Sequence, residues 1–97
     1  MNCQHGGRET PQCFEILASG IEAEKFRRRL TCALSGLGWS ARIRVQDDPL
    51  RALDLGARSE PALLIDGRLV AEGMQSTEAL ESLLRPYLGQ PKHSPAP

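Results

Sequence analysis

A proline-led hairpin over residues 59–73 constrains the fold of this chain more than any other feature of its sequence. The apolar run at 62–65 is followed by Asp66 and Gly67, and then by a second apolar run that Gly73 closes. Asp-Gly between two apolar runs indicates a type I′ turn, because both central residues of that turn need positive φ. Pro61 stands where a strand begins, one of the few strand positions that tolerate proline. The segment therefore predicts two antiparallel strands joined by a tight turn.

The length and composition are those of one ordinary domain. The chain has 97 residues, 40% of them hydrophobic and 25% charged, which suffices for a single core and leaves no room for a second. Twelve basic residues balance twelve acidic ones, so the net charge indicates neither nucleic acid nor an anionic membrane as a partner. No apolar run approaches the roughly 20 residues that cross a bilayer, and the first residues lack the apolar core of a secretory signal. We therefore expect a cytoplasmic protein that does not enter the membrane.

Polar segments enclose the predicted domain. Residues 1–12 read as a flexible leader, and residues 89–97, with three prolines and a glycine, read as a disordered tail. The domain then extends over residues 13–88. No internal repeat divides it.

The first half of this domain predicts a strand, a helix and a second strand. An apolar run over 13–18 suits a buried strand, and Ser19 with Glu22 matches a capping box at the start of a helix. The alternation over 41–46 predicts a strand that is apolar on one side and basic on the other. One face of the helix carries its apolar residues: Ile21, Phe26, Leu30, Ala33, Leu34 and Leu37.

Two further helices flank the hairpin. Asp48 followed by Pro49 predicts an N-cap and the first turn of a short helix over 49–55. After the hairpin, Ser76 caps a last helix. The order is therefore β-α-β-α-β-β-α, an α/β fold. A right-handed crossover makes the first two strands parallel, and the hairpin completes a four-stranded mixed sheet with helices on both faces.

In this order of elements, residues 13–88 resemble the small, glutaredoxin-sized members of the thioredoxin-like superfamily. Residues 66–70 and Gly73 match the hairpin of that family, and Pro61 stands at the place of its cis-proline. The resemblance implies a cis bond between Glu60 and Pro61. It also implies a backbone edge beside the first helix, where an extended stretch of a partner binds.

The same resemblance shows which chemistry is missing. In the family a C-x-x-C motif opens the first helix, and here Ile21 and Glu24 occupy its two cysteine positions. The first thiol of the motif is favoured as thiolate by the helix N-terminus, and the second resolves the mixed disulfide. The chain is thus expected to have lost dithiol exchange and to be a binding or accessory module rather than an enzyme. The predicted surface for a protein or peptide partner comprises Gly20, Ile21, Glu24, Glu60 and Pro61.

Three cysteines leave an alternative open. Cys3, Cys13 and Cys32 have neither C-x-x-C nor zinc-ligand spacing, and we expect reduced thiols. Cys13 reads as a small buried residue that opens a central strand, and Cys32 falls on the polar side of the first helix. The alternative is a thiol-disulfide redox protein or sensor that uses a relocated Cys13 or Cys32.

Other residue types point to no further site. His5 and His93 lie in the two polar ends, and the pair Cys3 and His5 falls short of a tetrahedral metal site. Trp39, after the first helix, reads as a lid on the core. The sequence therefore indicates no cofactor and no metal, and it leaves the oligomeric state open.

Overall fold

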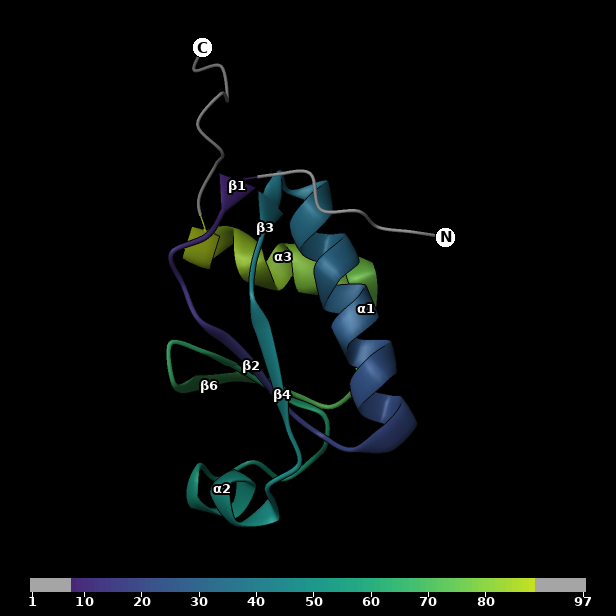
Figure 1. Ribbon diagram of the computed structural model, residues 1–97, viewed down its shortest axis with the longest axis vertical. Helices are drawn as coiled ribbons and strands as arrows, with labels where there is room; N and C mark the ends of the chain where they lie inside the picture. The colour runs from purple at the N-terminus through teal and green to yellow at the C-terminus, as the bar shows by residue number, and fades with distance from the viewer. Residues whose placement is uncertain (1–7, 89–97) are drawn as a thin grey trace.

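A four-stranded mixed sheet with helices on its two faces forms the centre of the computed structural model, which describes residues 8–88 (Figure 1). The strands of this sheet are β2 (Phe14–Leu17), β4 (Ile43–Gln46), β5 (Ala62–Ile65) and β6 (Arg68–Glu72). The helices are α1 (Gly20–Gly36), α2 (Pro49–Asp54) and α3 (Thr77–Leu88). The sheet order is β4-β2-β5-β6, with β2 parallel to β4 and antiparallel to β5, and β5 antiparallel to β6. The predicted α/β class, the mixed four-stranded sheet and the placement of helices on both faces are confirmed.

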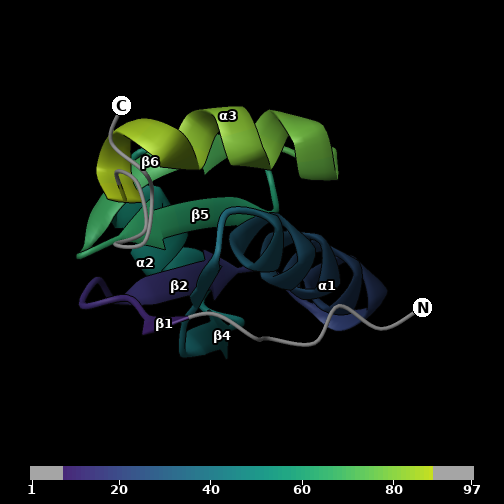
Figure 2. The ribbon, with the colours of Figure 1, turned by 90° about the horizontal axis from the view of Figure 1, so that it is seen from above.

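The two faces of the sheet have separate cores. On one face α1 and α3 pack against each other and cover Phe14 and Ile16 of β2 (Figure 2). On the other face, residues of and after α2 cover Leu17, Ala62 and Leu64. Successive residues of a strand point to opposite faces, so β2 and β5 contribute to both cores. These strands are therefore apolar at nearly every position.

One carboxylate interrupts this apolar pattern. Glu15, in the middle of β2, points to the α2 face with only 13% of its side chain exposed. Its Oε1 lies 3.0 Å from Nη2 of Arg51 in α2, and its Oε2 accepts a hydrogen bond of 2.7 Å from Nε2 of Gln46. Because a charge held this far from water needs partners, the ion pair fixes α2 over β2.

The hairpin has the predicted turn. Asp66 and Gly67 have φ of 51° and 81°, the positive values that a type I′ turn requires. The Oδ1 of Asp66 also accepts a 2.9 Å hydrogen bond from the backbone N–H of Cys13, and the N–H of Asp66 donates to the Cys13 carbonyl at 2.8 Å. In β6, the register leaves one extra residue, Val70, opposite the step from Leu63 to Leu64, which makes a β-bulge.

Local helix signals were reliable in two cases and wrong in one. The side chains of Asp48 and Ser76 accept N-cap hydrogen bonds, as predicted. Ser19 is the N-cap of α1, but its side chain makes no capping hydrogen bond, so the predicted capping box is wrong. The next residue, Gly20, has φ of +58°, and this left-handed turn changes the direction in which the chain enters the helix.

Two more expectations differ from the structure. The expected strand over 41–46 begins only at Ile43, as β4, and a separate short strand, β3 (Trp39–Ser40), precedes it. Trp39 packs half-buried against the core. Within the expected leader, β1 (Arg8–Glu9) pairs with β3 in parallel. Two backbone bonds hold this pair, from Arg8 to Gly38 and from Thr10 to Ser40. Residues 1–7 of the leader, and the expected tail, lie outside the described residues.

Within residues 8–88, no helix is both long enough and apolar enough to span a membrane.

The core between α1 and the sheet should dominate stability. Leu30 has no exposed surface and packs in the α1–α3 core, whereas Leu50 on α2 is 75% exposed. Replacing Leu30 by alanine removes buried methyl groups and leaves a cavity, so we expect a loss of about 2–5 kcal/mol in the free energy of unfolding. The matched variant Leu50→Ala should change it by less than about 0.5 kcal/mol. Urea unfolding followed by circular dichroism measures both, and equal losses would contradict the assignment of the core.

Candidate functional site

The end of the sheet where α1 begins brings together the two halves of the predicted surface. In the antiparallel pair of β2 and β5, Leu17 lies opposite Ala62. The same register places Ala18 beside Pro61, so the first residues of α1 follow directly from a position next to the Glu60–Pro61 segment. Figure 1 shows the first turn of α1 at the lower end of the molecule, where α2 also lies.

The first turn of α1 stands clear of the sheet. Gly20 is exposed, and a Cβ built at this position would meet no atom within 4 Å. Ile21 is 82% exposed, so its expected place on the buried face of the helix is wrong. The buried face begins one half-turn later, at Ala23, because the helix passes over the sheet only from that residue on. Ile21 is thus a large apolar side chain presented to solvent.

The Glu60–Pro61 segment presents an unpaired backbone next to a buried ring. The peptide bond between Glu60 and Pro61 is cis, and Pro61 is fully buried. The Pro61 carbonyl accepts a 2.8 Å hydrogen bond from the N–H of Gly73, which ties the segment to the end of β6. Glu60 itself is exposed and makes no hydrogen bond with another residue of the described chain. Its amide and carbonyl therefore remain available to water or to a partner.

Hollows lie on both sides of this end of the sheet. One, of about 350 Å³, lies on the α1 side and is lined by Gly20, Ala23, Glu24 and Val45 among others. The other, of about 230 Å³, lies on the α2 side and includes both Glu60 and Leu53. Leu53 is 73% exposed, so apolar surface continues from the segment onto α2.

The charges at this end are mixed and exposed. Glu24 forms an ion pair with Arg27 one helical turn later, at 3.2 Å, with about half of each side chain exposed. Such a pair contributes about 0–1 kcal/mol to stability. Glu24 and Glu60 nevertheless place acidic groups on the two sides of the predicted surface. No cysteine belongs to either hollow.

The structure places the two candidate redox cysteines elsewhere. Cys13 precedes β2, and its side chain is exposed and free, so the expectation of a buried strand residue is wrong. The length of β2, about 13 Å, separates it from the Pro61 end of the sheet. Cys32 is half-buried on α1 and is disulfide-bonded, so the expectation of reduced thiols is wrong for this residue. Spacing in the sequence could not reveal this bond, because a disulfide depends on which residues meet in space. Cys3 lies outside the described residues.

The part of the chain that the structure describes offers no metal centre. Among residues 8–88, no group of three or more histidine, cysteine, aspartate or glutamate side chains is arranged to hold a metal ion. His5 and His93, considered from the sequence, lie outside the described residues.

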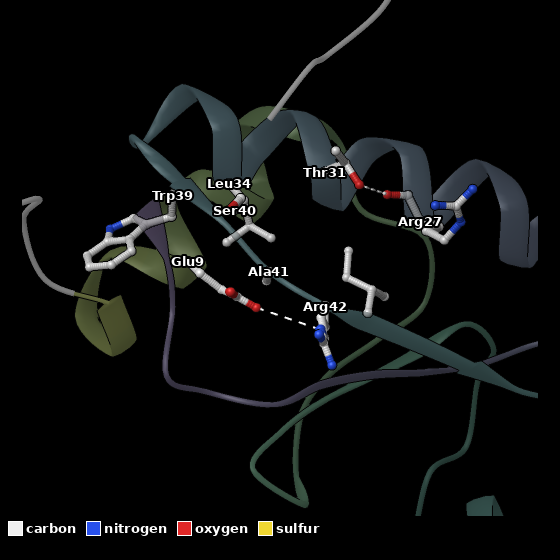
Figure 3. A pocket seen from close by; sticks show the side chains of 9 residues that line it. Glu9, Arg27, Thr31, Leu34, Trp39, Ser40, Ala41 and Arg42 are labelled. Carbon is white, nitrogen blue, oxygen red and sulfur yellow. Dashed lines mark hydrogen bonds and ion pairs between the residues drawn. The ribbon is translucent and has the colours of Figure 1, made fainter. Parts of the chain in front are cut away.

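A further hollow, of about 410 Å³, was not found from the sequence. It lies between α1 and the chain segment from Trp39 to Ile43, with Thr31 and Leu34 on the helix side (Figure 3). Arg42, at its rim, faces Glu9 at 3.8 Å. Arg27 lines this hollow and also the 350 Å³ hollow described above, so the two are neighbours along α1 and β4, and together they are named the α1–β4 groove below. The alternation over 41–46 was the only sequence signal for it.

No model of a known protein family matches the chain, and no curated protein matches it either.

The exposure of Cys13 predicts a selective thiol reaction. Alkylation of the native protein with iodoacetamide should modify Cys13, whereas Cys32 should react only after reduction. Peptide mass spectrometry locates the modified residues, and Cys13→Ser is the matched control. A native protein in which Cys13 resists alkylation would contradict its exposure.

Proposed function

We propose that this chain is a thioredoxin-fold protein that binds a protein or peptide partner and has lost dithiol exchange. The element order and the strand order β4-β2-β5-β6 support the fold part of the proposal. So does the succession of one parallel and two antiparallel pairs across the sheet. The expected motif positions also lie at the end of the sheet where that fold carries its active site.

The exposed side chain of Ile21 is the observation that carries the binding function. The resemblance assigns it the position of the family's first thiol, and 82% of its surface is exposed. Removing an isoleucine side chain from water contributes about 1.5–3 kcal/mol. A partner that covers Ile21 gains this free energy, whereas an isolated protein gains nothing from exposing it.

The unpaired backbone of Glu60 supports an extended partner segment. Pairing with an exposed backbone edge supplies main-chain hydrogen bonds, and neighbouring hollows supply side-chain selectivity. Here Glu60 provides the free amide and carbonyl, and the hollows on the α1 and α2 sides lie next to it. The bound partner would thus lie across the end of the sheet, between Ile21 and Leu53.

A second candidate function is a thiol sensor that uses Cys13. Its free and exposed side chain favours this reading. Treating the protein with mild peroxide before alkylation separates the two functions. A sensor loses alkylation at Cys13 at low peroxide, whereas a thiol without this role retains it.

The lost chemistry should be recoverable if the proposed fold is correct. The double variant Ile21→Cys/Glu24→Cys recreates the C-x-x-C spacing at the start of α1, where exposed N–H groups favour thiolate. We expect it to catalyse insulin reduction by dithiothreitol, while the unaltered protein stays at the uncatalysed rate. The control Ile21→Cys/Lys25→Cys places the thiols at another spacing and should remain inactive. Activity of the unaltered protein, or an inactive but folded double variant, would contradict the proposal.

The binding function is tested by photo-crosslinking from the same surface. A benzoylphenylalanine in place of Ile21 should capture a defined partner in cells that express the protein, and added purified protein should compete for it. Purified Ile21→Lys should compete at least about tenfold less well, because the buried apolar contact is lost. The control position is Tyr87, which is 44% exposed near the end of α3. The same captured proteins at both positions would count against a site at Ile21.

A further inference from the structure

Strand β4 has a free edge, along which the backbone N–H and C=O groups of alternate residues point away from the sheet. It is the first strand in the order β4-β2-β5-β6, so only β2 pairs with it. The N–H of Ala18 donates to the Gln46 carbonyl at 3.1 Å, which shows that Gln46 directs its backbone groups toward β2. Backbone groups alternate along a strand, so those of Ile43 and Val45 point away from the sheet. A further strand could therefore bond to this edge.

The α1–β4 groove lies along this same edge. Ile43 borders its larger hollow, of about 410 Å³, and Val45 borders its smaller one, of about 350 Å³. These two residues face the α1 side, because they pair in register with Phe14 and Ile16. Residues two apart in a strand are about 6.6 Å apart, the same period that separates alternate side chains of a bound strand. Val45 is 42% exposed, so the apolar floor of the groove is not covered by the described chain.

The opposite face of β4 is cationic. Arg44 pairs in register with Glu15 and so points to the α2 side, and it is exposed and forms no ion pair within residues 8–88. Arg42 lines a hollow together with Arg44 and also stands at the rim of the 410 Å³ hollow. The side chain of Arg42 is 92% exposed, and its Nε lies 3.8 Å from Oε2 of Glu9, a separation at the outer limit of an ion pair. Two arginine side chains beside this edge can therefore form ion pairs with acidic groups of a partner.

We propose that β4 accepts an extended peptide of a partner protein as a fifth strand, in which small apolar residues alternate with acidic residues. The apolar side chains occupy the two hollows of the α1–β4 groove, and the acidic side chains lie across from Arg42 and Arg44. Opposite charges across a strand pair are favourable, and the backbone bonds to Ile43 and Val45 provide the remaining affinity.

Charge excludes the other occupants that the chain itself could provide. Two copies paired through β4 would bring the arginines of one copy against those of the other, and like charges facing each other are unfavourable. Residues 1–7 and 89–97 contain no aspartate or glutamate. Neither end of the chain therefore supplies acidic side chains to the arginines. A partner with acidic residues at every second position does, and it brings no arginines against them.

The free backbone of β4 is distinct from that of Glu60, so this proposal does not rest on the proposed function, although the 350 Å³ hollow borders both surfaces. In the sheet, β2 lies between β4 and the strand that follows Pro61. Ile21 lines neither hollow of the α1–β4 groove, so a variant at Ile21 should leave strand addition intact, which keeps failures of the two proposals distinguishable.

The experiment measures binding of a fluorescent peptide that alternates glutamate and valine, by anisotropy at low salt. Two control peptides have the same length: one alternates lysine and valine, and one has the glutamates and valines in two blocks. We expect binding of the alternating acidic peptide only. N-methylation at single positions of this peptide should then weaken binding at every second residue, because only alternate N–H groups of an added strand face β4. Uniform effects, or none, would overturn strand addition.

Protein variants test the contacts. Arg42→Glu/Arg44→Glu should weaken binding of the acidic peptide by about tenfold or more and improve binding of the lysine peptide. Ile21→Lys should bind as the unaltered protein does. Arg28→Glu/Arg85→Glu makes the same change in net charge at exposed arginines that line none of the hollows described here, and it should have little effect. If both arginine double variants lost the same affinity for the acidic peptide, net charge alone would explain the effect, and the proposal would be overturned. So would dimers in sedimentation velocity that the peptide does not displace, since these would make a second copy the occupant.

Discussion

Strand β2 is bonded along both edges and covered on both faces, so each of its side chains must find a partner in a particular layer. Phe14 and Ile16 meet α1 and α3, and Leu17 meets the residues around α2. Glu15 is the residue of this strand that most needs a specific partner. Its carboxylate is largely removed from water, so it depends on Arg51 for a counter-charge. The position of the short helix α2 follows from that requirement. The apolar area that α2 could bury is small by comparison, since most of its residues are exposed.

The same strand determines where the candidate site lies. Pairing of β2 with β5 brings the start of α1 beside the Pro61 segment, and pairing with β4 makes β4 an edge next to α1. Two surfaces result, one across the end of the sheet and one along its side. They share the 350 Å³ hollow, whose lining includes both Gly20 and Val45. A single helix, α1, thus borders both surfaces.

The features that could be predicted from sequence are those set by near neighbours in the chain. The Asp66–Gly67 turn and the Asp48 cap depend on a few adjacent residues, and both are present. Helical periodicity put Ile21 on the buried face, because it does not reveal where a helix leaves the sheet. The resemblance put the same residue on a partner-binding surface, and its side chain is exposed. The partner of Glu15 is 36 residues away, and pairing of β1 with β3 involves two residues each, too short for a periodic signal. For the candidate site, the motif positions came from resemblance, whereas the free backbone of Glu60 and the α1–β4 groove required three-dimensional packing.

The bulge at Val70 gives the two edges of the sheet different properties. Edge β6 has an irregular spacing of backbone groups, and bulges of this kind oppose further pairing. Edge β4 pairs in uninterrupted register over four residues. Growth of an open-ended fibril by edge-to-edge stacking needs a competent edge on each side of every unit. The regular edge of β4 and the bulged edge of β6 therefore oppose such repeated stacking, because only one of the two edges is regularly spaced for a further strand.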